Sequence, residues 1–404
     1  MALDSEIQYL FDRFDKINCG PLALKNRIAM APLTRQCADD DGTPNDEMVA
    51  YYARRARGGI GLIITEGTYP ADNLSGVGYL NQPGCDNDKH QAGWKKIADA
   101  CHNHGAKVIL QLMHAGRVAD PRTIKDGEQP VSASDTHSSG WVLYTDNDTE
   151  LHDRGLTGEW PIINFPPARS LTEDELNIVA DDFAAAAKRA VDAGCDGVEV
   201  HGANGYLLYQ FTDPKQNLRT DAYGGSAENN LRFPRMVVDR IRAAIGPDKL
   251  ITYRISQDGV DDFTGFWEAG QSYVEALGVE LGKMDADAIH WSSFNWQDNR
   301  YDPSAPPIPV TLKKMSGKPF ITNGNIFDGA SAEEVFKQDA GDIVAVGRPV
   351  FAHPDWAYIV ASGMDYDWME FDRKYVIKPA YDYTYAYPTG LPDRNWAPNA
   401  KIKR

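Results

Sequence analysis

The chain has 404 residues, of which 42% are hydrophobic and 25% charged, and this composition is typical of a globular protein. Its formal net charge of −17 argues against a nucleic-acid-binding or anionic-membrane surface, because both need a basic face. Small anionic molecules can still bind in a local pocket.

The five cysteines are far apart and form no Cys-x-x-Cys pair. We therefore expect no iron–sulfur cluster, no structural zinc and no disulfide framework. The first residues show neither a basic start nor an apolar run, and no segment approaches eighteen uninterrupted apolar residues. These features predict a cytoplasmic protein without a metal site and without membrane or nucleic-acid partners.

Short apolar runs alternate with amphipathic stretches along the chain, which predicts parallel strands joined by helices. Eight strands are expected, at Arg27–Pro32, Ile60–Thr65, Ala106–Leu112, Asp196–His201, Lys249–Ile255, Ala286–Trp291, Lys318–Thr322 and Asp342–Val346.

Two helices have clear starting signals. Thr172 and Glu175 have the spacing of a capping box, and Ser226 precedes a second amphipathic stretch. Further helices are expected at Asn45–Arg57, Asp88–His104, Phe266–Lys283, Val310–Ser316, Gly329–Gln338 and Pro354–Ser362.

Eight strands, each followed by a helix, favour one (β/α)8 TIM-barrel domain over residues 1–404. An open doubly wound sheet is the alternative, but it normally carries a Gly-x-Gly-x-x-Gly turn, which this chain lacks. The polar insertion at 118–170 has the length of a lid or capping segment. The aromatic tail at 363–404 is expected to pack on the barrel or on a partner subunit, as in a homodimer.

Active-site groups of such barrels come from the C-terminal ends of the strands. Here the fourth expected strand runs directly into His201, Asn204 and Tyr206, three side chains that can donate hydrogen bonds to one ligand atom. Gly202 and Gly205 lie between them and allow a sharp turn. A plain glycine turn with a hydrogen-bonded histidine is the alternative interpretation.

Loops after the last two strands of such barrels often hold a phosphate group. Gly324 and Gly347 allow close approach of the backbone, and Arg348 offers a guanidinium fork that matches phosphate. Two glycine turns with a surface arginine would give the same pattern.

Three further strand ends suit a flat polar ring such as an isoalloxazine. Gln111 can pair with a pyrimidine edge, and Arg254 can stabilise the negative charge of a reduced flavin. Thr34 can bond a ring carbonyl. Each side chain could instead fill the polar mouth of a barrel or cap a turn.

The chain resembles the old yellow enzyme family of FMN-dependent ene-reductases, or NADH:flavin oxidoreductases. The resemblance rests on the motifs at Arg27–Arg35, Ile64–Thr68, Gln111–Arg117, His201–Tyr206, Arg219–Ser226 and Gly347–Arg348. It implies non-covalently bound FMN. The implied FMN contacts are Pro32, Leu33, Thr34, Gly67, Gln111, His201, Arg254, Gly324, Asn325, Gly347 and Arg348.

The resemblance also implies a ping-pong reaction in which NAD(P)H reduces FMN and leaves before an enone, enal or nitroalkene binds. His201 and Asn204 would hold the activating oxygen of the substrate, and Tyr206 would donate the proton. Met113, Trp291 and Trp296 are expected to shape the substrate pocket.

Two other functions stay open from the sequence. One is a flavin-binding protein without useful turnover, acting as a sensor or scaffold. The other is a metal-dependent hydrolase with His102 and His104 as ligands, although residues two apart on a helix diverge.

Overall fold

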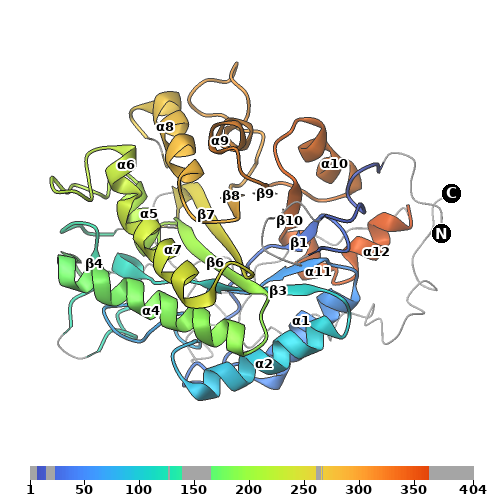
Figure 1. The fold of residues 1–404 in the computed structure, drawn as a ribbon, viewed down its shortest axis with the longest axis horizontal. Helices are drawn as coiled ribbons and strands as arrows, with labels where there is room; N and C mark the ends of the chain where they lie inside the picture. Colours follow the sequence, from blue (N-terminus) through green and yellow to red (C-terminus); the bar gives the residue numbers. More distant parts are fainter. Residues whose placement is uncertain are drawn as a thin grey trace, which may run out of the picture.

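Eight parallel strands close into a barrel, in which each strand is hydrogen-bonded to two neighbours (Figure 1). The structure is a computed structural model that describes residues 7–14, 23–125, 128–138, 165–260, 265 and 267–363. Around the barrel the strands are β1 (Ile28–Met30), β10 (Ile343–Val346), β9 (Phe320–Asn323), β8 (Ala288–Ser292), β7 (Leu250–Gly259), β6 (Gly197–Asn204), β3 (Lys107–Leu112) and β2 (Leu62–Ile64). The predicted TIM barrel is confirmed, and the open doubly wound sheet is excluded.

Two strands run well past the ends that the sequence predicts. β6 continues past His201 to Asn204, with a register shift between Gly202 and Asn204, and β7 continues to Gly259. The end of β6, up to Asn204, is therefore still paired to β7.

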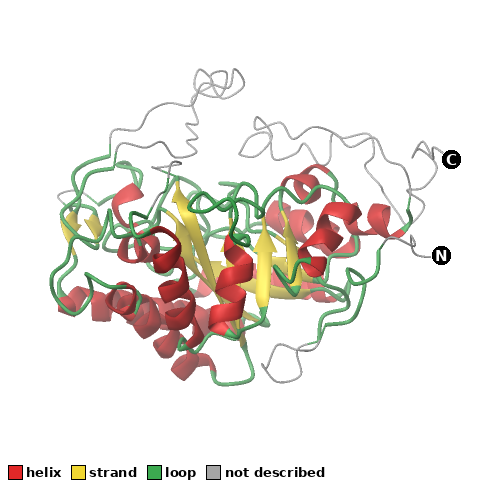
Figure 2. Cartoon of the chain, turned by 90° about the horizontal axis from the view of Figure 1, so that it is seen from above, coloured by secondary structure: helices red, strands yellow, loops and turns green. Residues whose placement is uncertain are grey.

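The helices pack around the strands (Figure 2). They are α1 (Asp46–Arg57), α2 (Asp88–His102), α4 (Glu173–Asp192), α5 (Leu207–Thr212), α6 (Ala227–Asn230), α7 (Arg232–Ile245), α8 (Gly270–Gly282), α9 (Ile308–Ser316), α10 (Gly329–Lys337), α11 (Arg348–Ala352) and α12 (Trp356–Ala361). Within the described ranges, no helix is both long enough and apolar enough to cross a membrane.

The two helix starts with clear sequence signals are confirmed. The Thr172 hydroxyl accepts the backbone N–H of Glu175, whose carboxylate accepts the N–H of Thr172 at 2.9 Å, and this capping box starts α4. Ser226 caps α6, but the helix expected after it divides at Leu231 into α6 and α7. The short helices α5 and α11 were not predicted.

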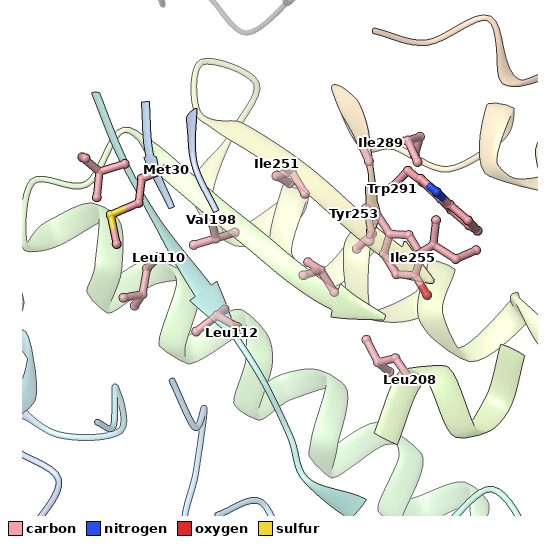
Figure 3. Packing of buried hydrophobic residues seen from close by; sticks show 14 of the residues in the cluster. Met30, Leu110, Leu112, Val198, Leu208, Ile251, Tyr253, Ile255, Ile289 and Trp291 are labelled. Atoms are coloured by element: carbon pink, nitrogen blue, oxygen red, sulfur yellow. The ribbon is translucent and has the colours of Figure 1, made fainter. Parts of the chain in front are cut away.

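Apolar side chains on the outer face of the barrel pack against the helices. Val198 on β6, Ile251, Tyr253 and Ile255 on β7 and Ile289 on β8 belong to this outer cluster (Figure 3). A second, smaller cluster fills the barrel interior with Ala29, Ala31, Leu62, Ile64, Ile109, Leu250, Ile321, Ile343 and Ala345. Because strand side chains alternate, the residues between the outward ones face the interior.

The insertion at 118–170 is described only in part. Within it, β4 (Val131–Ser132) pairs with β5 (Arg169–Ser170) at its C-terminal end. Residues 139–164 and the tail beyond Gly363 lie outside the described residues. The predicted lid and the predicted packing of the tail therefore stay predictions.

Candidate active site

One wall of the barrel interior is polar. Gln111 on β3 is the register partner of Glu199 on β6. Two residues further, His201 pairs with Arg254 on β7, which pairs with His290 on β8. All five side chains are buried. The strands facing them, β9, β10, β1 and β2, carry mostly Ile, Leu and Ala on their inner faces. A polar wall opposite an apolar wall suits a flat ring system with one polar edge.

Glu199 is the centre of the hydrogen bonding on this wall. Its Oε1 accepts Gln111 Nε2 at 2.9 Å, and its Oε2 accepts Thr252 Oγ1 at 3.0 Å and His290 Nδ1 at 2.7 Å. Burial would raise the pKa of Glu199, but attraction to His290 and Arg254 and the donated hydrogen bonds lower it to about 2. Glu199 is therefore a carboxylate at neutral pH.

Glu199 and His290 were not predicted from the sequence. The sequence nevertheless contains a signal for both residues. Each is a single polar residue between apolar neighbours in a strand, in Val198-Glu199-Val200 and in Ile289-His290-Trp291. Such a residue must face an interior that can hydrogen-bond it.

Three buried nitrogen atoms of the polar wall have no hydrogen-bond partner among the described residues. They are His201 Nδ1, Arg254 Nε and His290 Nε2. A buried group left unsatisfied costs about 1–3 kcal/mol, so a ligand that bonds here is favoured. The Arg254 guanidinium, beside Gln111, fits the polar ring edge of FMN, and a neutral His201 has one ring N–H to offer a ligand.

The charges of these two side chains are set by their burial. Burial and the nearby Arg254 lower the pKa of His201 well below its usual value, so its imidazole is neutral at pH 7. Burial also lowers the pKa of Arg254, to about 10, which still leaves a cation. The wall therefore presents one neutral donor and one fixed positive charge.

The end of β6 and the turn after it carry the three predicted catalytic residues. Asn204 has a φ of 59°, and its backbone N–H donates to Ser256 Oγ at 2.7 Å. Tyr206 lies directly before α5, and its ring centroid is 5.2 Å from that of His201. Gly205, with a φ of 89°, makes the turn between Asn204 and Tyr206.

A small apolar cluster lies beside these residues. It contains Met113, Tyr206, Tyr79 and Phe165, the last of which comes from the end of the insertion. Tyr79, which the sequence analysis did not select, shares a 3.0 Å hydrogen bond with Thr34 Oγ1. Met113 therefore lies where it can shape a pocket beside Tyr206.

The two tryptophans named from the sequence differ in what the structure shows of them. Trp291 belongs to the outer cluster between strands and helices (Figure 3), so the expectation that it lines the pocket is wrong. The reason is alternation, since its neighbours His290 and Ser292 take the inward positions. Trp296 is buried in the same outer cluster, and its role as a substrate contact stays a prediction.

The predicted phosphate loops follow neighbouring strands. Gly324 (φ 135°) and Asn325 (φ 53°) follow β9, and Gly347 precedes α11, which begins at Arg348. The guanidinium of Arg348 lies 5.0 Å from the ring centroid of Phe327. Asn325 and Arg348 are exposed, as a phosphate-binding edge requires.

The remaining predicted flavin contacts follow β1 and β2. Pro32 is buried, and Leu33 and Thr34 are half-buried after β1. A Cβ at Gly347 would touch only the side chains of Ala31 and Leu33, both at 3.7 Å, so the loops after β1 and β10 are adjacent.

Gly67 follows β2. A Cβ at this position would stand 2.6 Å from Met113 Sδ and 3.4 Å from Gln111 Oε1. Glycine at this position therefore leaves room for the side chain of Met113.

The histidines considered for a hydrolase lie at the other end of the barrel. His102 ends α2, and its Nε2 is 2.7 Å from Oδ2 of Asp196, which directly precedes β6. The described part of the chain holds no group of three or more His, Cys, Asp or Glu side chains that could hold a metal ion. His102 therefore cannot act together with His201.

The fold and this donor set define the class of (β/α)8-barrel flavoprotein oxidoreductases. The chain belongs to the NADH:flavin oxidoreductase / NADH oxidase family, whose model matches residues 12–367. This match confirms the resemblance to old yellow enzymes. The protein is an FMN-dependent oxidoreductase that uses NAD(P)H.

Individual relatives agree with this assignment. The chain is 34% identical to the NADH oxidase of Thermoanaerobacter brockii over 85% of its own length, but it spans only 50% of that protein. It is 33% identical to the chanoclavine-I aldehyde reductase fgaOx3 of Penicillium roqueforti, over 93% of this chain and 96% of the relative. The solved structure of morphinone reductase is similar with a TM-score of 0.78 and 31% identity, covering 97% of this chain and 99% of that one.

Proposed function

We propose that this enzyme is an ene-reductase that reduces the activated C=C bond of α,β-unsaturated carbonyl or nitro compounds. The placement of His201 and Asn204 at the end of β6, with Tyr206 directly before α5 and its ring beside that of His201, carries the proposal. Two of the relatives, an aldehyde reductase and morphinone reductase, have names that describe reductions of carbonyl-containing compounds.

We assign the FMN contacts to the strand ends. Gln111 would pair with the pyrimidine edge, Thr34 would bond a ring carbonyl, and Arg254 would stabilise negative charge. Pro32, Leu33 and Gly67 would border the ring, and the phosphate would lie at Gly324, Asn325, Gly347 and Arg348.

FMN, when bound, supplies the hydride that it has taken from NAD(P)H. His201 and Asn204 donate to the activating oxygen of the substrate, where negative charge builds, and each such donor is worth roughly 10²–10³ in rate. His201 does this as a neutral imidazole, because burial lowers its pKa. Tyr206 then donates its phenolic proton to the α-carbon. Met113 and Trp296 border the substrate.

Steady consumption of NADPH or NADH by the FMN-loaded protein with 2-cyclohexenone, together with formation of cyclohexanone, tests this function. Flavin absorbance without coenzyme consumption would instead support the alternative, a flavin-binding protein without turnover. Substrate range and coenzyme preference follow from the same assay with enals, nitroalkenes and both coenzymes.

The remaining proposals concern the whole protein. We propose a single cytoplasmic domain over residues 1–404, in which 118–170 forms a lid and 363–404 packs on the barrel or in a homodimer. Sedimentation of a chain truncated at Gly363 tests the dimer, since an unchanged sedimentation coefficient would place the tail outside any subunit interface.

A further inference from the structure

The Gln111 amide is held from one side by Glu199. Gln111 Nε2 donates to Glu199 Oε1 at 2.9 Å, and the two residues are register partners on β3 and β6. The other end of the amide, Oε1, lies toward Gly67 on the far side of β3, 3.4 Å from the position that a Cβ there would take. The amide therefore bridges from the carboxylate toward the end of β2.

A carboxylate fixes which way an amide points. The two ends of a glutamine amide have nearly the same shape, so packing alone selects weakly between the two orientations. An ionised carboxylate only accepts hydrogen bonds, so it accepts the NH₂ group and repels the carbonyl oxygen. Glu199 therefore favours the orientation in which Gln111 Oε1 points away from it.

The carboxylate is itself fixed by donors on the neighbouring strands. Glu199 Oε2 accepts Thr252 Oγ1 at 3.0 Å from β7 and His290 Nδ1 at 2.7 Å from β8. With Oε2 held by two donors, Oε1 is left for Gln111. All four side chains are buried, so water does not compete for these bonds.

We propose that Glu199 is a positioning residue for the cofactor, because it fixes the Gln111 amide so that Oε1 and the second N–H remain for the pyrimidine edge of FMN. The proposal rests on the FMN site of the proposed function. It goes beyond that site because Glu199 need not touch FMN itself.

A double-mutant cycle on FMN binding tests this role. FMN is titrated into the apoprotein, and its dissociation constant is measured by quenching of flavin fluorescence. Glu199→Gln should weaken FMN binding about tenfold or more, because a hydrogen bond to a charged group is worth about that factor. In a Gln111→Leu background the same change should alter the constant less than about twofold, because the amide that Glu199 orients is gone.

Two further variants keep the test decisive. Thr252→Val removes one donor to Glu199 Oε2 but leaves the bond to Gln111, so FMN binding should stay within about threefold of wild type. Glu199→Asp keeps the negative charge beside Arg254 but shortens the side chain. This variant replaces Glu199→Gln in the cycle if circular dichroism shows that Glu199→Gln does not fold. Its loss of FMN affinity should also disappear in the Gln111→Leu background.

If Glu199→Gln lowered FMN affinity equally with and without Gln111, the positioning role would be overturned. Glu199 would then act on the fold or on FMN independently of the amide. Wild-type apoprotein that binds no FMN would instead contradict the proposed function. The two failures are therefore distinguishable.

Discussion

The backbone N–H of Asn204 donates to Ser256 Oγ at 2.7 Å, and the same hydroxyl donates to the carbonyl oxygen of Asp258 at 2.7 Å. This pair joins the bulged end of β6 to β7 and holds Asn204 at a φ of 59°. The Asn204 side chain meets Ser292 Oγ through its Oδ1, at the long distance of 3.5 Å. Its Nδ2 is thereby left to donate to a ligand.

Ser256→Ala should therefore weaken the binding of a ligand oxygen by His201 and Asn204, without weakening the binding of FMN. The variant leaves the N–H of Asn204 and the carbonyl of Asp258 without their shared partner, which costs about 1–3 kcal/mol and frees the bulge. We expect the dissociation constant for phenol, measured by absorbance titration of the FMN-loaded protein, to rise about tenfold, because 1.4 kcal/mol corresponds to that factor. FMN affinity should stay unchanged.

Ser292→Ala is the matched control for this variant. It removes only the long contact to Asn204 Oδ1, so its effect on phenol binding should stay within about threefold. Phenol affinity that is unaltered in Ser256→Ala would show that the hydroxyl does not position Asn204.

Tyr206→Phe should separate the two half-reactions. Without the phenolic proton, alkene reduction should slow by about 10²–10⁴, the usual contribution of a general acid. Reduction of the flavin by NAD(P)H needs no proton from Tyr206 and should stay close to wild type. Anaerobic stopped-flow absorbance follows each half-reaction separately, and an equal loss in both would remove Tyr206 from the role of proton donor.

Glu66 gives the protein a pH-dependent stability that a single variant can isolate. Its carboxylate is buried after β2 and accepts the Arg35 backbone N–H at 2.9 Å and the Tyr52 hydroxyl at 3.1 Å. Burial raises the pKa of Glu66 to about 7, although the nearby Arg35 opposes the rise. Between its usual pKa and about 7, the folded state binds more protons than the unfolded state, so the stabilising contribution of Glu66 falls as the pH rises.

Glu66→Gln cannot titrate and should not show this loss. The free energy of unfolding of the variant, relative to wild type, should rise by up to about 3 kcal/mol between pH 4.5 and pH 8. Urea unfolding of both proteins across this range measures the difference, in which the other titrating groups cancel. A difference that does not depend on pH would mean that Glu66 titrates normally in the fold.

The sequence predicts the barrel well because buried parallel strands are short apolar runs. All eight expected strands are present, and the capping box of Thr172 and the cap of Ser226 mark helix starts correctly. The short helices α5 and α11 were missed because five or six residues are too few to show helical periodicity.

The site was predicted less completely. The grouping of His201, Asn204 and Tyr206 could be inferred from one continuous segment, but the bulge at Gly202–Asn204 is set by pairing with β7 and has no local signal. Glu199 and His290 act on Gln111 only through contacts between strands. Because strand side chains alternate, an inward-facing His290 would have placed its neighbour Trp291 on the outer face of the barrel.

The central claim is that FMN lies beside a site where His201 and Asn204 bind an oxygen atom of the ligand. Visible absorption spectra of the purified protein and of Asn204→Ala, each recorded before and after addition of phenol, test this claim most directly. We predict flavin bands in both proteins. Phenol should add a long-wavelength charge-transfer band in wild type, with at least about tenfold weaker phenol affinity in the variant, because a donor to an anionic oxygen is lost. Absence of flavin bands after incubation with FMN, or equal phenol affinity in both proteins, would contradict the account.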